Sequence, residues 1–194
     1  MPFHRFEFNQ LPVSPWRNGG GETREIVSLP LGNADFDWRA SIATIAQAGP
    51  FSAFNGIDRS ITLLEGDGVH LYSAGQIDHR LTTIGEPFAF SGDLEVQAHL
   101  PGGSSQDFNI MTRRGRQSAD VQPIAVTTAL PAGHAGVIYV LRGDWQLRQP
   151  QPLTLSTRQG GWWSAMDGAC QLAPLTPNAL ALWADIRPHN PSGG

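Results

Sequence analysis

Short runs in which apolar and polar residues alternate extend along most of the chain. Residues 38–45, for example, place Trp38, Ala40 and Ile42 on one face of a strand. The 22 glycines and 15 prolines separate these runs, and no stretch of ten or more residues keeps a helical period. The pattern therefore predicts an all-β fold made of many short strands.

One strand-turn-strand pattern occurs twice, at positions 61 and 138, which are 77 residues apart. Residues 61–71 and residues 138–147 both begin with apolar strands, and both reverse at Gly-Asp, a strong hairpin signal. Two further pairs of segments follow in the same order: 81–82 with 153–154, and 108–111 with 181–184. We therefore expect two small antiparallel β-barrels from an internal duplication, residues 1–115 and residues 116–194. The segment before Asp35 has no counterpart and is expected to add strands to one or both barrels.

The first half carries polar side chains on one strand face. Arg39 and Ser41 lie opposite the apolar face of their strand, and Asp107, Asn109 and Met111 lie opposite the apolar face of theirs. Such a face either meets water, as in many antiparallel sheets, or lines the mouth of a barrel. The second half has no counterpart of Asn109, so a site is expected in the first half.

Residues 16–26 contain three consecutive glycines directly before an alternating strand. Consecutive glycines indicate a sharp turn or a close approach, either to a ligand or to another strand. A phosphate-binding loop is excluded, because the Gly-Lys-Ser/Thr ending is missing and the chain contains no lysine.

Metal and nucleophile signals are weak. The six histidines, at positions 4, 70, 79, 99, 134 and 189, form no HxH or HxxxH pair, so we expect no bound metal and no cofactor. There is no GxSxG elbow, and Cys170, the single cysteine, is most simply a small buried residue. The carboxylates that could supply an acid/base pair are Glu22, Glu25, Asp93 and Asp107.

Arginines are better candidates for binding. Arg59 follows the loop 51–58 and opens an apolar strand, where an unpaired charge is costly. Its partner is either a ligand carboxylate or an internal carboxylate such as Asp58 or Glu25. Arg39 is expected to be the more deeply embedded of the two arginines, with a larger role in stability.

These observations predict a pocket in the first barrel that binds a small carboxylate. Arg59 would clamp the carboxylate, and Trp16 and Phe51 would form the walls. The predicted ligand-binding residues are Trp16, Asn18, Thr23, Glu25, Arg39, Ser41, Phe51, Arg59, Asp107, Asn109 and Met111.

Charge and composition exclude several classes of protein. The formal net charge is −4, and the only basic cluster, residues 113–116, is interpreted as a solvated linker, so no nucleic-acid partner is expected. No run of eighteen apolar residues and no apolar signal segment are present, which favours a cytoplasmic protein without a membrane partner.

Several motifs, in order, resemble the HutD/Ves family of bacterial proteins. The matching segments are 15–26, 38–43, 49–52, 58–59, 64–66, 90–93 and 107–114, and the resemblance covers about residues 3 to 115, with the remainder matching loosely. It implies a bicupin-like fold, which agrees with the duplication inferred above.

The resemblance also implies a link to histidine utilisation. A HutD-like protein is expected to moderate that pathway by binding a carboxylated intermediate such as urocanate or formylglutamate. The alternative is a metal-independent cupin-type enzyme, an isomerase or a hydrolase, acting on a similar carboxylate. The oligomeric state stays open, with a homodimer as one alternative.

Overall fold

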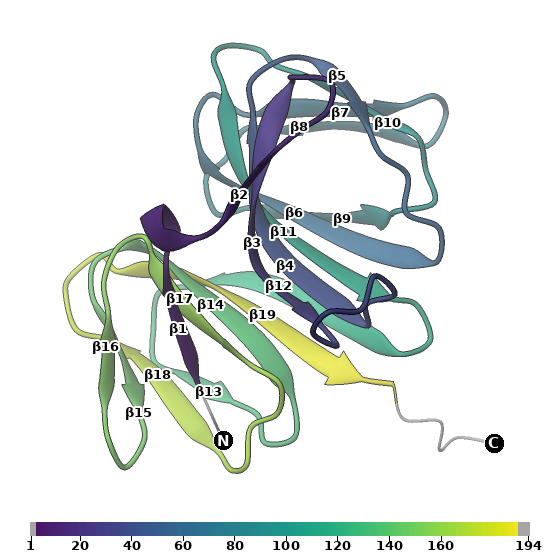
Figure 1. The fold of residues 1–194 in the computed structure, drawn as a ribbon. Coiled ribbons are helices and arrows are strands. Elements are labelled where there is room, and N and C mark those ends of the chain that lie inside the picture. Colours follow the sequence, from purple (N-terminus) through teal and green to yellow (C-terminus); the bar gives the residue numbers. More distant parts are fainter. Residues whose placement is uncertain (1–2, 190–194) are drawn as a thin grey trace. The chain divides into compact units, whose positions relative to one another are not determined.

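The computed structural model describes residues 3–189, whose regular secondary structure is almost entirely antiparallel strand (Figure 1). The one helix in this range is a short 3-10 turn, η1 (Phe8–Gln10), so the predicted all-β class is confirmed. Within residues 3–189, no helix has the length and hydrophobicity that a membrane crossing requires. The chain divides into a first unit, Pro12–Arg114, and a second unit, Met1–Leu11 with Gly115–Gly194.

The first unit consists of two antiparallel sheets. The larger has the strand order β2-β3-β4-β11-β6-β9, and the smaller has the order β5-β10-β7-β8. Apolar residues of both sheets, such as Ile45, Ile61 and Leu71, pack into one core. The strands are β2 (Val13–Pro15), β3 (Gly21–Leu29), β4 (Trp38–Ile45), β5 (Gly49–Phe51), β6 (Ile57–Glu65), β7 (Val69–Ser73), β8 (Ile77–Leu81), β9 (Pro87–Ser91), β10 (Val96–His99) and β11 (Ser105–Arg113).

The second unit has the same construction. Its larger sheet has the order β1-β17-β14-β19-β12, and its smaller sheet has the order β13-β18-β15-β16. Three indole rings, of Trp145, Trp163 and Trp183, belong to its core. The strands are β1 (His4–Glu7), β12 (Gln117–Ile124), β13 (Thr128–Leu130), β14 (Ala135–Arg142), β15 (Trp145–Arg148), β16 (Leu153–Leu155), β17 (Gln159–Trp163), β18 (Cys170–Pro174) and β19 (Leu180–Pro188).

The two units repeat each other strand by strand. The order β4-β11-β6-β9 corresponds to β12-β19-β14-β17, and β5-β10-β7-β8 corresponds to β13-β18-β15-β16. The Gly-Asp turns lie between β6 and β7 and between β14 and β15, at equivalent places in the two units. This matching order is what an internal duplication produces.

The N-terminal strands extend the two repeats differently. β2 and β3 add to the β4 edge of the first unit, whereas β1 pairs with β17, with Phe6 opposite Gly160. Residues 3–11 therefore belong to the second unit, and not with residues 12–115 as the sequence led us to expect.

The basic cluster at residues 113–116 is not simply a solvated linker. Arg113, at the end of β11, pairs with Asp35 at 2.6 Å. Arg114 bridges Asp58 and Asp93, with N···O distances of 2.7 and 3.0 Å. Arg113 and Arg114 thus form ion pairs with three carboxylates of the first unit.

A close backbone approach in the second unit gives a stability prediction. A Cβ added at Gly136 in β14 would overlap the indole ring of Trp163, which is 1% exposed. We expect Gly136→Ala to lower the free energy of unfolding by roughly 1–3 kcal/mol, because overpacking a full core forces side chains from their rotamers. Urea denaturation followed by circular dichroism measures the loss.

Gly168→Ala is the matched control in the same unit. No described atom lies within 4 Å of a Cβ added there, so its effect should stay within about 0.5 kcal/mol. Equal losses in the two variants would contradict the packing explanation.

Candidate functional site

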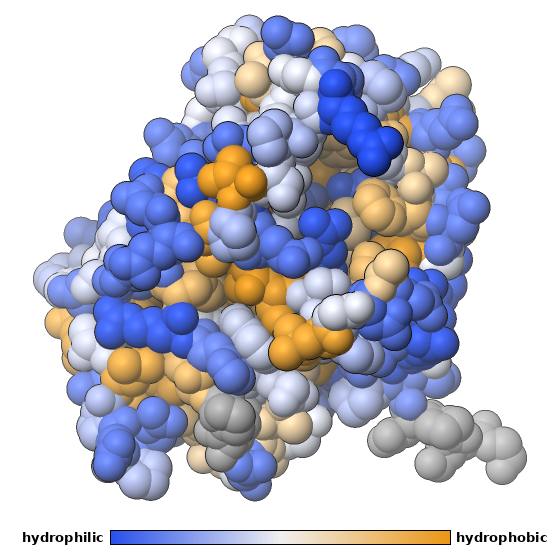
Figure 2. Space-filling model, viewed as in Figure 1, coloured by the Kyte–Doolittle hydropathy of each residue, from blue (hydrophilic) through white to orange (hydrophobic). Residues whose placement is uncertain are grey.

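The first unit contains a cavity of about 300 Å³, the size of a small-molecule site. Figure 2 shows the surface hollowed in the upper part of the view, where hydrophilic and hydrophobic atoms border the recess. The lining residues are Trp16, Asn18, Thr23, Arg39, Ser41, Ala43, Ile45, Pro50, Phe51, Ser52, Phe54, Arg59, Ile61, Asp107, Asn109 and Met111.

Strand register explains why these side chains share one face. Alternate residues of β11 face the cavity, and each has a neighbour directly opposite on β4 and on β6. Met111 lies between Arg39 and Arg59. Asn109, two residues away, lies between Ser41 and Ile61.

This face of the sheet does not simply meet water. Ser41 and Asn109 are each 5% exposed, and Asp107 is fully buried. These polar residues therefore do not form a solvated sheet face, because such a face would leave them exposed.

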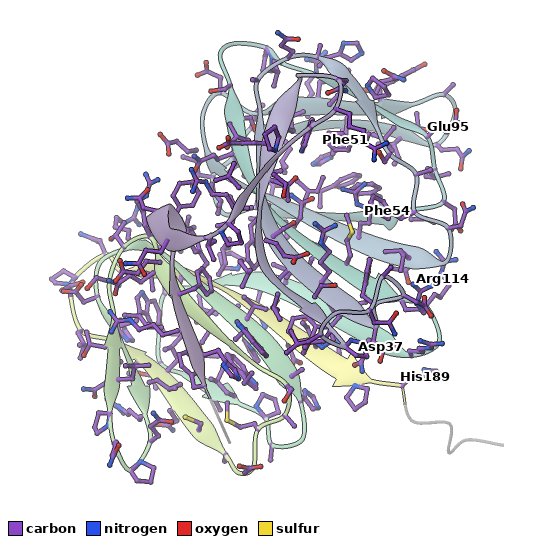
Figure 3. All side chains as sticks on the ribbon, viewed as in Figure 1. Asp37, Phe51, Phe54, Glu95, Arg114 and His189 are labelled. Atoms are coloured by element: carbon purple, nitrogen blue, oxygen red, sulfur yellow. The ribbon has the colours of Figure 1, made fainter. Side chains whose placement is uncertain are left out.

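Arg59 is the most unusual group in the cavity. It is 9% exposed, and its guanidinium carbon lies 5.1–5.4 Å from the ring centroids of Phe51, Phe54 and Phe90. Figure 3 labels Phe51 and Phe54. Burial, with a smaller effect from the charge of Arg39, lowers the pKa of Arg59 to about 10, so the group remains a cation at neutral pH.

Neither internal partner considered for Arg59 is available. Asp58 pairs with Arg114, and Glu25 pairs with Arg39. Among residues 3–189, no carboxylate lies within ion-pair distance of Arg59, its Nε has no acceptor, and its one hydrogen bond runs from Nη2 to Oδ1 of Asn109 at 3.4 Å. An unpaired buried cation of this kind is costly and is therefore rare.

Arg39 differs from the expectation. Its side chain is 26% exposed, and its Nε donates to Oε1 of Glu25 at 3.0 Å. Arg59 is thus the deeply buried arginine and Arg39 the peripheral one: β4 and β6 flank β11 on different sides, and the rings of Phe51, Phe54 and Phe90 surround Arg59.

Asp107 lies toward the other end of the β11 row. Its Oδ2 accepts a hydrogen bond from Ser105 at 2.8 Å, and its buried Oδ1 has no partner within residues 3–189. Burial raises the pKa of Asp107 to about 7, and the Ser105 hydrogen bond opposes the shift. The carboxyl group is therefore partly protonated near neutral pH.

The glycine-rich segment forms the hairpin loop between β2 and β3. Nε1 of Trp16 donates to Oγ1 of Thr23 at 2.8 Å, and the indole meets Phe51 edge-on, with 6.4 Å between ring centroids. A Cβ at Gly21 would overlap the carbonyl oxygen of Thr44, so that close approach is to a neighbouring strand. The loop nevertheless also lines the cavity, through Asn18.

Every predicted site residue except Glu25 lines the cavity; Glu25 reaches it only through its pair with Arg39. The lining residues that were not predicted are Ala43, Ile45, Pro50, Ser52, Phe54 and Ile61. Ala43 and Ile45 continue the period-two face of Arg39 and Ser41, a signal that was present in the sequence. Phe54 lies in a loop, where no periodicity could indicate it.

Within residues 3–189, no three histidine, cysteine, aspartate or glutamate side chains are grouped so that they could hold a metal ion. His70 and Asp78 approach to 2.6 Å, but they form only a pair. The cavity therefore offers arginine, amide and hydroxyl groups for recognition rather than a set of metal ligands.

The second unit has indole rings where the first unit has the cavity. With Ile138 matched to Ile61, the register places Trp183 at the position of Asn109 and Gly136 at the position of Arg59. Trp163 covers Gly136, and both indoles belong to the core. The expectation that the second half has no counterpart of Asn109 agrees with this register, although Asp185 and Gln122 take the positions of Met111 and Ser41.

Known proteins resemble the chain over nearly its whole length. The HutD family model matches residues 9–181. The protein Ves of Escherichia fergusonii and that of Citrobacter koseri are each 43% identical over 182 residues, which cover 93% of this chain and 92% of the relative.

Solved structures agree. A conserved protein of unknown function from Pseudomonas aeruginosa PAO1 matches with a TM-score of 0.86 and 28% identity, covering 96% of this chain and 100% of its own. HutD from Pseudomonas fluorescens matches with a TM-score of 0.83 and 25% identity, covering 97% and 100%. An oxalate decarboxylase from Lactobacillus farciminis, with a TM-score of 0.66 and 8% identity over 97% of this chain and 86% of its own, shows likeness of fold alone.

The family match and the relatives together show that this chain, with its bicupin-like pair of β units, belongs to the HutD/Ves family.

Proposed function

We propose that the protein binds a small carboxylate in the cavity of the first unit and, through that binding, moderates histidine utilisation. The observation that carries the proposal is the buried guanidinium of Arg59, which has no carboxylate partner among the described residues. A ligand carboxylate would supply the missing charge through charge-assisted hydrogen bonds.

The surroundings of Arg59 favour a carboxylate with a small organic body. Three phenyl rings surround the guanidinium, and Trp16, Ile45 and Ile61 provide apolar wall. Urocanate and formylglutamate, two carboxylates of histidine breakdown, are the ligands to test first. HutD from Pseudomonas fluorescens is described in a formate condition, and formate carries the same group.

A catalytic role receives less support. Asp107 has a pKa near that of a general acid or base, but it is the only one of the four candidate carboxylates that lines the cavity. Among the described lining residues, no second carboxylate completes an acid/base pair. The geometry therefore favours a binding protein over the alternative of a metal-independent isomerase or hydrolase.

The direct test is a thermal-shift and calorimetric screen of the purified protein. The compounds are urocanate, formylglutamate, formiminoglutamate, histidine and glutamate. A ligand that binds only the folded state raises the melting temperature. If none of these compounds binds, the proposed ligand class is wrong.

Replacing Arg59 should lower ligand affinity without lowering the stability of the fold. Arg59→Met should weaken a carboxylate ligand by roughly ten- to a hundredfold, because a hydrogen bond to a charged group contributes about 1.5–3 kcal/mol. The unligated variant should be at least as stable as the wild type, since an uncompensated buried charge has been removed. Calorimetry gives the affinity, and thermal melting gives the stability.

Arg80→Met is the matched control, because Arg80 is an exposed arginine in β8 of the same unit and does not line the cavity. It removes the same charge and should leave affinity unchanged. Equal weakening in both variants would mean that only overall charge matters.

The raised pKa of Asp107 predicts a pH dependence of stability. An unfolded aspartate has a pKa of about 3.9, so between about pH 4 and pH 7 the folded state binds more protons than the unfolded state. The contribution of Asp107 is therefore complete below about pH 4 and is lost as the pH rises through about 7.

Asp107→Asn should remove this loss, so that between pH 4 and pH 8 the variant gains on the order of 1–4 kcal/mol relative to the wild type. Urea denaturation at several pH values measures the difference. Glu95→Gln, at an exposed position, should follow the wild-type curve. Parallel curves for Asp107→Asn and the wild type would show that Asp107 ionises normally.

A further inference from the structure

Two arginines reach the same cross-strand row of the cavity face. Arg39 and Arg59 both lie directly opposite Met111, one on each neighbouring strand. Arg59 extends from there to Asn109, with 3.4 Å between Nη2 and Oδ1. Arg39 extends to Glu25, which lies opposite Ser41 in the pairing of β3 with β4. Because Ser41 and Asn109 are themselves opposite each other, both guanidiniums approach the same row.

Several hydrogen-bond donors along this row have no acceptor among the described residues. Arg39 is engaged only through Nε, and its two Nη atoms have no hydrogen-bond partner within residues 3–189. The hydroxyl of Ser41, on a residue 5% exposed, likewise makes no hydrogen bond to the described residues. Arg59 has only the long contact to Asn109. Arg39 and Arg59 thus reach Glu25 and Asn109 on one cross-strand row, with the hydroxyl-bearing Ser41 between those two residues.

Glu25 reaches this row from the edge of the site. Its side chain is 46% exposed, and it does not line the cavity itself. A β-bulge between Glu25 and Val27 shifts the register of β3 next to it. Bulges of this kind re-aim side chains and occur often beside functional sites.

We propose that the ligand carboxylate lies between Arg39 and Arg59 above Ser41, and that Glu25 is an internal competitor that holds Arg39 until the ligand arrives. This inference rests on the proposed binding of a carboxylate. It adds a second anion-binding arginine and a residue of the protein that weakens binding. The ligand class that fits is an anion able to take hydrogen bonds from two guanidiniums at once.

The size of the competition follows from the exposure of the pair. Partly exposed ion pairs contribute little, because water and salt screen them. Removing the carboxylate of Glu25 should therefore tighten ligand binding by about two- to fivefold, no more.

The test is calorimetric titration of Glu25→Gln with whichever of urocanate and formylglutamate binds the wild type more tightly. Glu22→Gln is the matched control: Glu22 lies on the same strand, pairs with Arg24 at 3.7 Å and is 37% exposed. It lies opposite Thr44 and does not line the cavity, so it should not compete. Both variants remove one negative charge, so a long-range charge effect would appear equally in the two.

The expected results are a two- to fivefold gain in Glu25→Gln, no gain in Glu22→Gln, and at least tenfold weakening in Arg39→Met. The double variant with Glu25→Gln and Arg39→Met should show no gain over Arg39→Met alone. Equal effects of Glu25→Gln and Glu22→Gln, or a gain that persists without Arg39, would overturn the inference.

Failure of the proposed function looks different. If the wild type binds neither compound, the carboxylate site itself is wrong. If the wild type binds and Arg59→Met does not, while Glu25→Gln matches the wild type, the site stands and only the competitor role of Glu25 falls. Thermal melting of each variant confirms that it is folded.

Discussion

Arg59 has no carboxylate beside it within residues 3–189, and this is the constraint on which the cavity of the first unit depends. Over that range the buried guanidinium is in contact with three phenyl rings and makes one long hydrogen bond to an amide. Carboxylates are present nearby, but Arg114 engages Asp58 and Arg39 engages Glu25. The surrounding arginines thus keep the internal anions away from Arg59, and the cavity keeps a cation that an external anion can satisfy.

The same sheet architecture gives a cavity in one unit and a filled core in the other. The strand order and the Gly-Asp turns are shared, but β2, β3 and the loop between them, which supply Trp16, Asn18 and Thr23 to the cavity, have no counterpart beside β12. The units also differ at a few inward positions, where Asn109 and Arg59 are replaced by Trp183 and Gly136. In the second unit the indole ring of Trp163 over Gly136 fills space that polar side chains leave open in the first unit.

Much of this arrangement follows from local sequence patterns. Period-two alternation places Arg39, Ser41, Asp107 and Asn109 on cavity-facing positions, because neighbouring residues of a strand point to opposite faces. The relative burial of Arg39 and Arg59 was predicted wrongly, since it depends on which side of β11 each strand pairs and on the loop that carries Phe54.

The placement of residues 3–11 was also not predicted. β1 pairs with β17, whose residues lie more than a hundred positions away along the chain, and no local pattern encodes such a pairing. The pairing of Glu25 with Arg39 could not be predicted from local sequence either, because the alternation of apolar and polar residues does not reveal the β-bulge that follows Glu25.

The indole over Gly136 has an evolutionary consequence. If the two units descend from one ancestral repeat, the second copy cannot acquire an arginine at position 136 in one step, because any side chain there meets the ring of Trp163. Shrinking Trp163 first would open a cavity in the core at a cost of about 3–5 kcal/mol, a large fraction of the roughly 5–15 kcal/mol by which proteins are stable. The order in which substitutions can be accepted is therefore restricted, and the specialisation of the two copies is hard to reverse.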